Sequence, residues 1–480
     1  MGLITKRKVQ EGVYWVEIPE TDLRILCGCP ADSIKHLAIK GFLPVVEMGG
    51  VQVEYGPNAI LLSDVLFQNG SLSNLAEFPI LHMFYTQGMI LPDHPNFKSP
   101  KPLIIGKKAQ IKAQLEYLHR GNYGLVSEHE FLDAGESKEF ADENLRMKLR
   151  FSQGEFTHPK KQMRSVILGD DSMELRKGAS IKRIEENVFE ISYKSETVKI
   201  DLNLRKYRKY QLPYQLPKIK LHDHYFAIIH SGEGDGWNQK QPCISSIVQF
   251  DGKRYLIDSG PNIEKVLDSF DLKPNQLEGV FFTHVHDDHF AGLYSLLQSH
   301  PDLKIFATPV IQASVYKKLA ALLSISEKKM ARQLNFYDLE REKWNNINGL
   351  QVKPIPSAHP VDTTVFIFRA KGKNGYRTYG HYCDIASLKW IRKMIVDSPT
   401  EIGISKAYFQ SIKKMLNIKL DLKKIDIGGP AIHGDVEDFS SDKTTRIILS
   451  HTHREYSARE LEIGKLVEFG QIEVLIEKRP

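Results

Sequence analysis

A short stretch rich in histidine and aspartate constrains this chain more than any other feature. It follows an apolar run at 279–282 that predicts a short buried strand, and it reads Thr283-His284-Val285-His286-Asp287-Asp288-His289. On an extended segment the side chains of His284 and His286 point the same way, because a strand has a period of two. Asp288 and His289 return from the following turn. Nitrogen and oxygen donors therefore converge on one small volume, which suits borderline cations such as Zn²⁺.

The same stretch could be an exposed polar turn that is rich in histidine, but chance rarely places this pattern at a strand end, so we favour a metal site. The spacing His-x-His-x-Asp-His is the signature of the metallo-β-lactamase superfamily, and residues 222–480 resemble that family. The resemblance implies an α/β fold, an αββα sandwich with metals at one edge. Nothing before residue 222 shares it. We expect a separate α+β domain of unknown role at 1–210 and the metal domain at 211–480.

Further metal ligands are expected at later strand ends. Three polar residues end strand-like segments in the order in which the family presents its ligands: His359, Asp384 and His451. The resemblance gives His359 to the first cation and His451 to the second, with Asp384 bridging both, although residues 381–383 separate Asp384 from Gly380 and the family has glycine beside this aspartate. The cofactors would be two divalent cations, Zn²⁺ first, with Mn²⁺ or Fe as alternatives. The full set of predicted ligands is His284, His286, Asp288, His289, His359, Asp384 and His451.

Other residues are assigned roles around these metals. Asp258 ends a predicted strand and resembles a family carboxylate that supports the metal ligands without binding metal itself. Asp288 would hold the second cation and could orient the nucleophile. His433 follows a Gly-Gly-Pro turn and could protonate the leaving group, or the segment could be a structural turn. His381 is the second candidate for this acid.

Hydrolysis is the expected chemistry. Two cations that share a hydroxide would activate it and stabilise the oxygens that gain charge during in-line displacement at a phosphodiester. A glycine-rich turn at 231–236 and the segment around His451 resemble the superfamily branch that contains transfer-RNA 3′-processing nucleases and cyclic-nucleotide phosphodiesterases. We therefore expect a phosphodiesterase that acts on a cyclic nucleotide or another nucleotide phosphodiester. An ester, lactone or thioester hydrolase on the same fold is one alternative. A diiron oxygen-binding or redox sensor protein is another, although such relatives often carry Glu in place of Asp288.

Charge and composition limit the partners. An excess of 65 Lys+Arg over 59 Asp+Glu gives +6 on 480 residues, a mild bias that tolerates a phosphate-bearing substrate without the dense basic footprint of a nucleic-acid binder. The basic, aromatic run at 205–217 could stack on a nucleic-acid strand, but we favour a linker stiffened by proline. RNA is therefore an alternative partner, and a small molecule or nucleotide is the favoured one.

The remaining signals concern location and the N-terminal half. Four scattered cysteines and the lack of a secretory apolar region predict a cytoplasmic protein, and no run is long enough for a membrane span. We also expect a homo-oligomer. Alternation of apolar and polar residues at 166–204 predicts antiparallel hairpins, and the charge-rich segment 137–165 predicts an exposed helix and loop.

Overall fold

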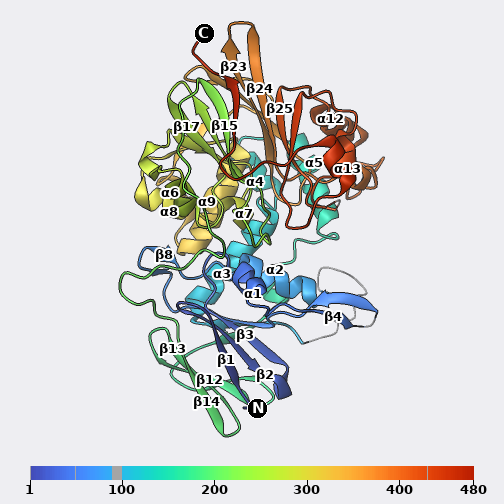
Figure 1. The fold of residues 1–480 in the computed structure, drawn as a ribbon. Helices are drawn as coiled ribbons and strands as arrows, with labels where there is room; N and C mark the ends of the chain where they lie inside the picture. Colours follow the sequence, from blue (N-terminus) through green and yellow to red (C-terminus); the bar gives the residue numbers. More distant parts are fainter. Residues whose placement is uncertain (1, 49, 89–99, 430) are drawn as a thin grey trace. The chain divides into compact units, whose positions relative to one another are not determined.

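The chain folds into two compact units (Figure 1). The computed structural model describes residues 2–48, 50–88, 100–429 and 431–480. The first unit contains the chain up to residue 119, residues 157–214 and the short segment 321–324; the second contains residues 120–156, 215–320 and 325–480. The division at 214/215 lies close to the predicted boundary at 210. The prediction had one boundary only, however, whereas residues 120–156 belong to the second unit.

Residues 120–156 join the second unit through an apolar contact and a buried ion pair. Leu125 and Phe131 share a small core with Val310. The ammonium group of Lys148 is fully buried and lies 2.8 Å from the carboxylate of Asp362. Residues 137–165 were expected to form an exposed helix and loop, and that expectation is wrong for the face of α5 that carries Lys148. A buried charge of this kind is tolerated because a carboxylate pairs with it.

The first unit contains two sheets that share one core. Its six-stranded sheet has the order β1-β2-β3-β6-β9-β10, and its four-stranded antiparallel sheet has the order β11-β12-β13-β14, as the alternation at 166–204 predicts. Two small hairpins, β4–β5 and β7–β8, lie outside these sheets. Apolar side chains from both sheets, such as Ile25 and Ile191, belong to the same core cluster. The strands are β1 (Thr5–Gln10), β2 (Val13–Ile18), β3 (Leu23–Cys27), β4 (Val45–Met48), β5 (Val51–Glu54), β6 (Ala59–Leu61), β7 (Phe67–Gln68), β8 (Ser71–Leu72), β9 (Leu103–Gly106), β10 (Arg164–Ile167), β11 (Met173–Arg176), β12 (Ala179–Glu185), β13 (Val188–Tyr193) and β14 (Glu196–Asp201).

The second unit is the αββα sandwich that the resemblance implies. A seven-stranded sheet, β20-β19-β18-β17-β16-β15-β27, faces a six-stranded sheet, β21-β22-β23-β24-β25-β26. Phe281 joins the two sheets, since its ring centroid lies 4.7 Å from that of Phe306 in its own sheet and 5.0 Å from that of Phe368 in the other. The strands are β15 (Phe226–Gly232), β16 (Ser245–Phe250), β17 (Lys253–Ile257), β18 (Gly279–Phe281), β19 (Lys304–Ala307), β20 (Asn335–Asp338), β21 (Asn345–Ile347), β22 (Leu350–Pro356), β23 (Thr364–Gly372), β24 (Gly375–Tyr382), β25 (Leu422–Asp426), β26 (Arg446–Ser450) and β27 (Ile472–Ile476).

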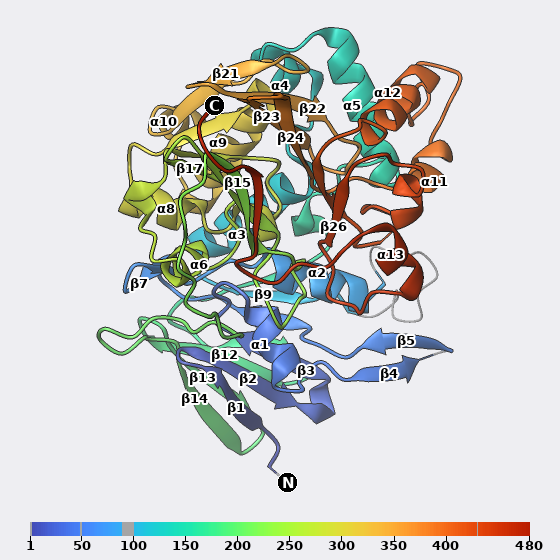
Figure 2. The same ribbon diagram turned by 45° about the horizontal axis from the view of Figure 1, so that its top comes forward.

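Helices cover the outer faces of this sandwich. Figure 2 shows α6, α8 and α9 on one side and α5, α11 and α12 on the other. Among the described residues, no helix combines the length and apolar character needed to cross a bilayer. The helices of both units are α1 (Ser33–Ile39), α2 (Glu77–Thr86), α3 (Lys108–Tyr123), α4 (Glu128–Asp133), α5 (Lys138–Phe151), α6 (Ile263–Ser269), α7 (Asp287–Phe290), α8 (Leu293–Ser299), α9 (Pro309–Leu323), α10 (Glu327–Ala331), α11 (Leu388–Arg392), α12 (Lys406–Leu416) and α13 (Ala458–Ile463).

The six-stranded sheet of the first unit repeats the first six strands of the second unit. The order β1-β2-β3-β6-β9-β10 corresponds to β15-β16-β17-β18-β19-β20, with the same antiparallel and parallel pairings. The register agrees as well: Leu61 lies opposite Cys27 and Ile105, as Phe281 lies opposite Ile257 and Phe306. The first unit therefore shares strand order and pairing with the second, although the sequence resemblance to the family begins at residue 222.

Local backbone details support the repeat. Both crossover helices after the third strand are seven residues long, and their N-caps, Asp32 and Asn262, have nearly the same left-handed conformation, with φ of 58° and 60°. This likeness could not be seen in the sequence, because the two units have few side chains in common at equivalent positions. The sheet order depends on the pairing of backbone groups instead.

Candidate metal centre

The histidine-rich stretch begins where strand β18 ends. Phe281 is buried between the sheets, so the chain leaves the core at a fixed point. Thr283 to Val285 follow the strand without regular secondary structure, and His286, whose backbone is extended, is the N-cap of the one-turn helix α7. The strand and the turn therefore bring the side chains of His284, His286 and His289 together, as the alternation predicted.

His359 and Asp384 lie next to His284 and His286, and the four side chains form a first set of possible metal ligands. His284 Nε2 lies 3.1 Å from His286 Nδ1, and His286 Nδ1 lies 3.2 Å from His359 Nε2. Asp384 Oδ2 is 3.5 Å from His284 Nε2 and 3.4 Å from His359 Nε2. All four atoms lie within 4.8 Å of one another.

A second set lies on the other oxygen of the same aspartate. Asp384 Oδ1 is 3.2 Å from His289 Nε2 and 3.5 Å from His451 Nε2. The two imidazole nitrogens are 3.4 Å apart, and His451 Nε2 lies 3.1 Å from Asp288 Oδ2. The three strand-end residues of the sequence analysis thus converge on one place, although they are far apart in the chain.

Both sets fit divalent cations. Tetrahedral Zn²⁺ with bonds of about 2.0–2.1 Å holds neighbouring donor atoms about 3.4 Å apart, which is the spacing found here. Both oxygens of Asp384 are buried and accept no hydrogen bond. A buried carboxylate without a partner is costly, and a cation between each oxygen and its imidazoles would remove that cost. Burial opposes ionisation of Asp384, but the charges of His451, His289 and His284 outweigh it, so the pKa of this carboxyl lies well below its usual range.

Asp258 contacts His289 and Thr283 and so supports the two sets of donor atoms, which together are called the cluster below. Its Oδ2 lies 2.8 Å from Nδ1 of His289 and accepts a hydrogen bond from the hydroxyl of Thr283, and its Oδ1 accepts one from the Thr283 N–H. Asp258 is therefore placed to hold His289 with Nε2 directed at the cluster. Asp258 and His451 both have positive φ, 59° and 65°, a strain that is typical of functional sites.

Asp426 is a residue that the sequence analysis did not select. It ends β25 and is fully buried; its Oδ2 lies 3.2 Å from His433 Nδ1, and its Oδ1 lies 3.3 Å from His451 Nδ1. Burial would raise the pKa of Asp426, but the charges of His433 and His451 lower it to about 2. A carboxylate at the end of a fully buried strand was the signal available in the sequence.

The two candidate acids lie in different surroundings. His433 is partly exposed, with 22% of its side chain accessible, and Nδ1 lies 3.5 Å from Asp384 Oδ2. Burial opposes its protonation, but Asp426 and Asp384 outweigh burial and raise its pKa. His381 is fully buried on β24, where Nδ1 lies 2.8 Å from the Tyr379 hydroxyl, and burial holds its pKa well below the usual range.

A further histidine lies on the loop after His451. His453 Nδ1 is 2.6 Å from Asp235 Oδ2, and 56% of the His453 side chain is exposed. Asp235 belongs to the glycine-rich turn after β15, which is joined to the same loop by the hydrogen bond from Asn238 to the Thr452 carbonyl. This turn, which the sequence analysis singled out, thus contacts the segment that carries His451.

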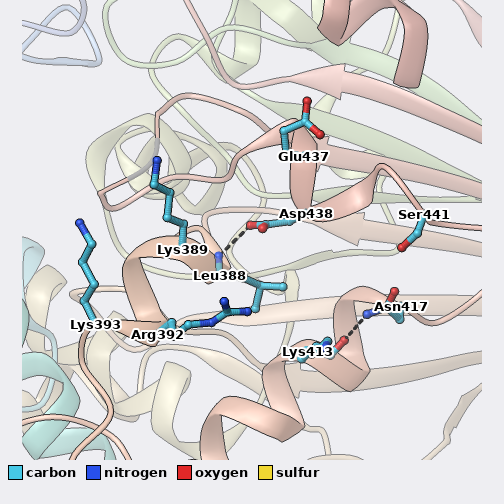
Figure 3. A pocket seen from close by; sticks show the side chains of 9 residues that line it. All are labelled: Leu388, Lys389, Arg392, Lys393, Lys413, Asn417, Glu437, Asp438 and Ser441. Atoms are coloured by element: carbon cyan, nitrogen blue, oxygen red, sulfur yellow. Dashed lines mark hydrogen bonds between the residues drawn. The ribbon is translucent and has the colours of Figure 1, made fainter.

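A hollow of about 520 Å³ shares no residue with the metal cluster. Four of its lining residues are cationic and two are acidic (Figure 3). Asp438 accepts a hydrogen bond from the N–H of Leu388 at the start of α11. The lining residues are Leu388, Lys389, Arg392, Lys393, Lys413, Asn417, Glu437, Asp438 and Ser441.

Comparison with known proteins adds to this geometry. Residues 226–380 match the family model described as anti-Pycsar protein Apyc1. Ribonuclease Z of Methanococcus maripaludis is 28% identical over 137 residues, which cover 27% of this chain and 42% of that protein. A cGMP-dependent 3′,5′-cGMP phosphodiesterase A of Dictyostelium discoideum is 22% identical over 149 residues, 31% of this chain and 17% of that protein. The crystal structure of human tRNase Z, short form, covers 52% of this chain and 99% of that chain, with 16% identity and a TM-score of 0.37.

The likeness is confined to part of each relative. The chain spans less than half the length of the curated relatives named above. Within the second unit, the observed order of the two sheets is that of the αββα sandwich that the sequence motif implies.

Proposed function

We propose that the second unit is a metal-dependent phosphodiesterase that cleaves a nucleotide phosphodiester with two divalent cations. The observation that carries the proposal is the placement of Asp384, whose two oxygens face separate sets of imidazole nitrogens at 3.2–3.5 Å. A single cation would leave one of these buried oxygens without a partner.

The ligands follow from the distances. The first cation would be held by His284, His286, His359 and Asp384, and the second by Asp288, His289, His451 and Asp384. When bound, a pair of divalent cations lowers the pKa of bound water and stabilises charge on phosphate oxygens. The carboxylate of Asp288 has a pKa below its usual range because the charges of His289 and His451 outweigh burial, so it is available as an anion.

His433 is the residue that we propose to protonate the leaving oxygen. Its raised pKa favours the protonated form, and Asp426 fixes the orientation of its ring. Its partial exposure allows contact with a substrate, whereas His381 is fully buried. A positioned acid of this kind contributes about 10²–10⁴-fold to a rate.

Nucleotide phosphodiesters are the proposed substrates because the relatives are named as ribonuclease Z and a cyclic GMP phosphodiesterase. The matches cover only part of each relative, so they favour the bond type more than a particular substrate. A cyclic nucleotide and a short RNA are the two candidates to compare. Esters, lactones and thioesters could use the same donor sets and must be included.

The experiment compares wild type with His286→Ala on four kinds of substrate: bis(p-nitrophenyl) phosphate, cyclic nucleotides, RNA, and ester or lactone probes. Wild type loaded with Zn²⁺ or Mn²⁺ should cleave a phosphodiester, and His286→Ala should lose both the activity and bound metal. His129→Ala is the matched control, because 82% of that side chain is exposed and it lies outside the cluster. Turnover of ester or lactone probes alone contradicts the proposal, and a visible absorption band from bound iron favours the redox alternative.

A further inference from the structure

A basic turn in the first unit presents one tyrosine to solvent. The turn spans residues 205–209, all of which are exposed, and 85% of the Tyr207 surface is accessible. The Arg208 N–H donates to the Arg205 carbonyl at 2.9 Å, which closes the turn over Lys206 and Tyr207. The sequence analysis favoured a linker here, but the structure shows a closed turn.

Two side chains, those of Asn69 and Gln68, hold the backbone of this turn in place. Asn69 donates from its side-chain amide to the carbonyls of Arg205 and Arg208, at 2.9 and 2.8 Å. Gln68 accepts from the Leu204 N–H at 2.8 Å and so fixes the chain just before the turn. Five residues of mixed polar composition would otherwise be free to move. The exposed ring is therefore presented at a defined position.

Tyr207 has a conformation that a bulky residue rarely adopts. Its φ is 65°, and the third position of a turn with positive φ ordinarily carries Gly or Asn. An aromatic residue there costs conformational free energy, and it gains no buried contact in return, since its ring is exposed. The ring thus contributes little to folding and is available for a partner.

The charges around Tyr207 specify what that partner would be. Lys206, Arg208 and Lys209 form no ion pair with a carboxylate in the part of the chain that the structure describes, and the ammonium of Lys206 lies 5.1 Å from the Tyr207 ring centroid. Arg205 reaches Glu11 at 3.5 Å, and Glu11 also binds Lys8 of β1, which extends the positive surface beyond the turn. An exposed ring among unpaired cations matches a base together with the phosphates on either side of it.

We propose that residues 205–209 bind single-stranded nucleic acid, with a base stacked on Tyr207 and the backbone phosphates paired with Lys206, Arg208 and Lys209. This binding is separate from hydrolysis, because the turn belongs to the first unit and needs no metal. A stacked base contributes enough to change affinity by about tenfold or more.

The test measures binding of a fluorescent oligouridylate of about 12 nucleotides, a length within the usual footprints of such sites, to the full chain in EDTA. Tyr207→Asn should weaken binding about tenfold without lowering the melting temperature, because Asn tolerates positive φ better than Tyr does. Tyr207→Phe should bind within about twofold of wild type, since it keeps the ring.

The charge contribution is tested with Lys206→Gln/Lys209→Gln. Losing two phosphate contacts should reduce the slope of log K against log salt by about 1.4 for a single strand. Lys177→Gln/Lys194→Gln removes the same charge from exposed turns of the same unit and should leave the slope unchanged. The proposal is overturned if Tyr207→Asn binds the oligonucleotide as wild type does, or if wild type binds vesicles of phosphatidylcholine and phosphatidylserine in its place. If the wild-type protein shows no phosphodiesterase activity in a separate assay, the proposed function fails, but the binding measured in EDTA still tests the proposal for residues 205–209.

Discussion

Asp64 in the first unit holds the position that His284 holds in the second. Each residue lies three places after a strand residue, Leu61 or Phe281, that has the same partners in the two sheets. Asp64 is buried with no exposed side chain, and its carboxylate binds the guanidinium of Arg183 at 2.7 Å. At the position where the second unit has a cluster of imidazoles, the first unit thus has an ion pair between Asp64 and Arg183.

Replacing Arg183 should affect stability and leave metal content unchanged. Arg183→Met removes the nearer of two cations that face the buried Asp64 carboxylate, since Lys107 remains at 3.8 Å, and the loss should lower the free energy of unfolding by about 2–3 kcal/mol. The measurement is urea unfolding together with elemental analysis. Lys194→Met removes an exposed pair with Glu20 and should cost less than about 1 kcal/mol. A fall in bound metal in Arg183→Met would contradict the view that only the second unit binds metal.

Asp258→Asn should weaken metal binding without removing a ligand. The amide cannot accept from both Thr283 and His289 as the carboxylate does, so the ring of His289 loses its orientation. Loss of such a supporting partner typically lowers metal affinity about 10–100-fold. Competition with a chelator measures the change. Asp223→Asn, a substitution of an exposed side chain, is the control, and equal affinities for the two variants would contradict the role of Asp258.

The sequence could predict the residues that form the centre because each lies at the end of a buried strand. His359, Asp384 and His451 were found in this way, and the structure brings them to His284. Asp426 follows the same rule, since it ends the buried strand β25. Which of His433 and His381 meets a substrate could not be predicted, because exposure depends on packing between β24, β25 and the loop at 427–435.

The repeat in the first unit could not be predicted for a different reason. The sequence predicted an α+β domain here, because the positions equivalent to those of the metal centre carry other residues, such as Asp64 in place of the ligand His284 and Gly28 in place of the supporting Asp258. Gly28 and Asp258 nevertheless share positive φ and donate to equivalent carbonyls, of Leu61 and Phe281. Backbone geometry is conserved between the units where side-chain chemistry is not.

His433→Ala should separate proton transfer from metal binding. If His433 is the acid, turnover of a substrate with a poor leaving group falls about 10²–10⁴-fold, while the metal content stays at the wild-type value. A p-nitrophenyl leaving group needs little protonation, so its turnover should fall much less. Metal loss comparable to that of His286→Ala would instead make His433 a ligand, since it also belongs to a possible donor set with Asp426 and His451.

Lys318→Met should destabilise the second unit. The ammonium of Lys318 on α9 is fully buried, 2.8 Å from Asp287 Oδ1 and 2.5 Å from the Val285 carbonyl oxygen. Removing the ammonium group leaves the buried carboxylate of Asp287 without the charge of Lys318. This loss should lower the free energy of unfolding by about 3–5 kcal/mol. Adding Asp287→Asn should restore part of the loss, because it removes the negative charge that Lys318 balances. Equal stability of wild type and Lys318→Met in urea would show that water replaces the lysine.

Asp438 should make stability depend on pH near the hollow of Figure 3. Burial is the main cause that raises its pKa from 3.8 to about 6. Because the folded pKa is the higher one, the folded state favours the protonated form, and stability is lost as pH rises from about 4 to 6. Asp438→Asn removes this titration and can still accept from the Leu388 N–H. The variant should therefore gain stability relative to wild type at pH 8 and show little difference at pH 4.

The neighbouring Glu437 provides a control of opposite sign. It binds Arg459, whose hydrogen bond is the main cause that lowers the pKa of Glu437. A lowered folded pKa adds stability above the unfolded value and loses it as pH falls, so Glu437→Gln should lower the melting temperature slightly at pH 8 and have no effect in acid. If Asp438→Asn and Glu437→Gln change the melting temperature in the same direction at pH 8, burial does not control the titration of Asp438.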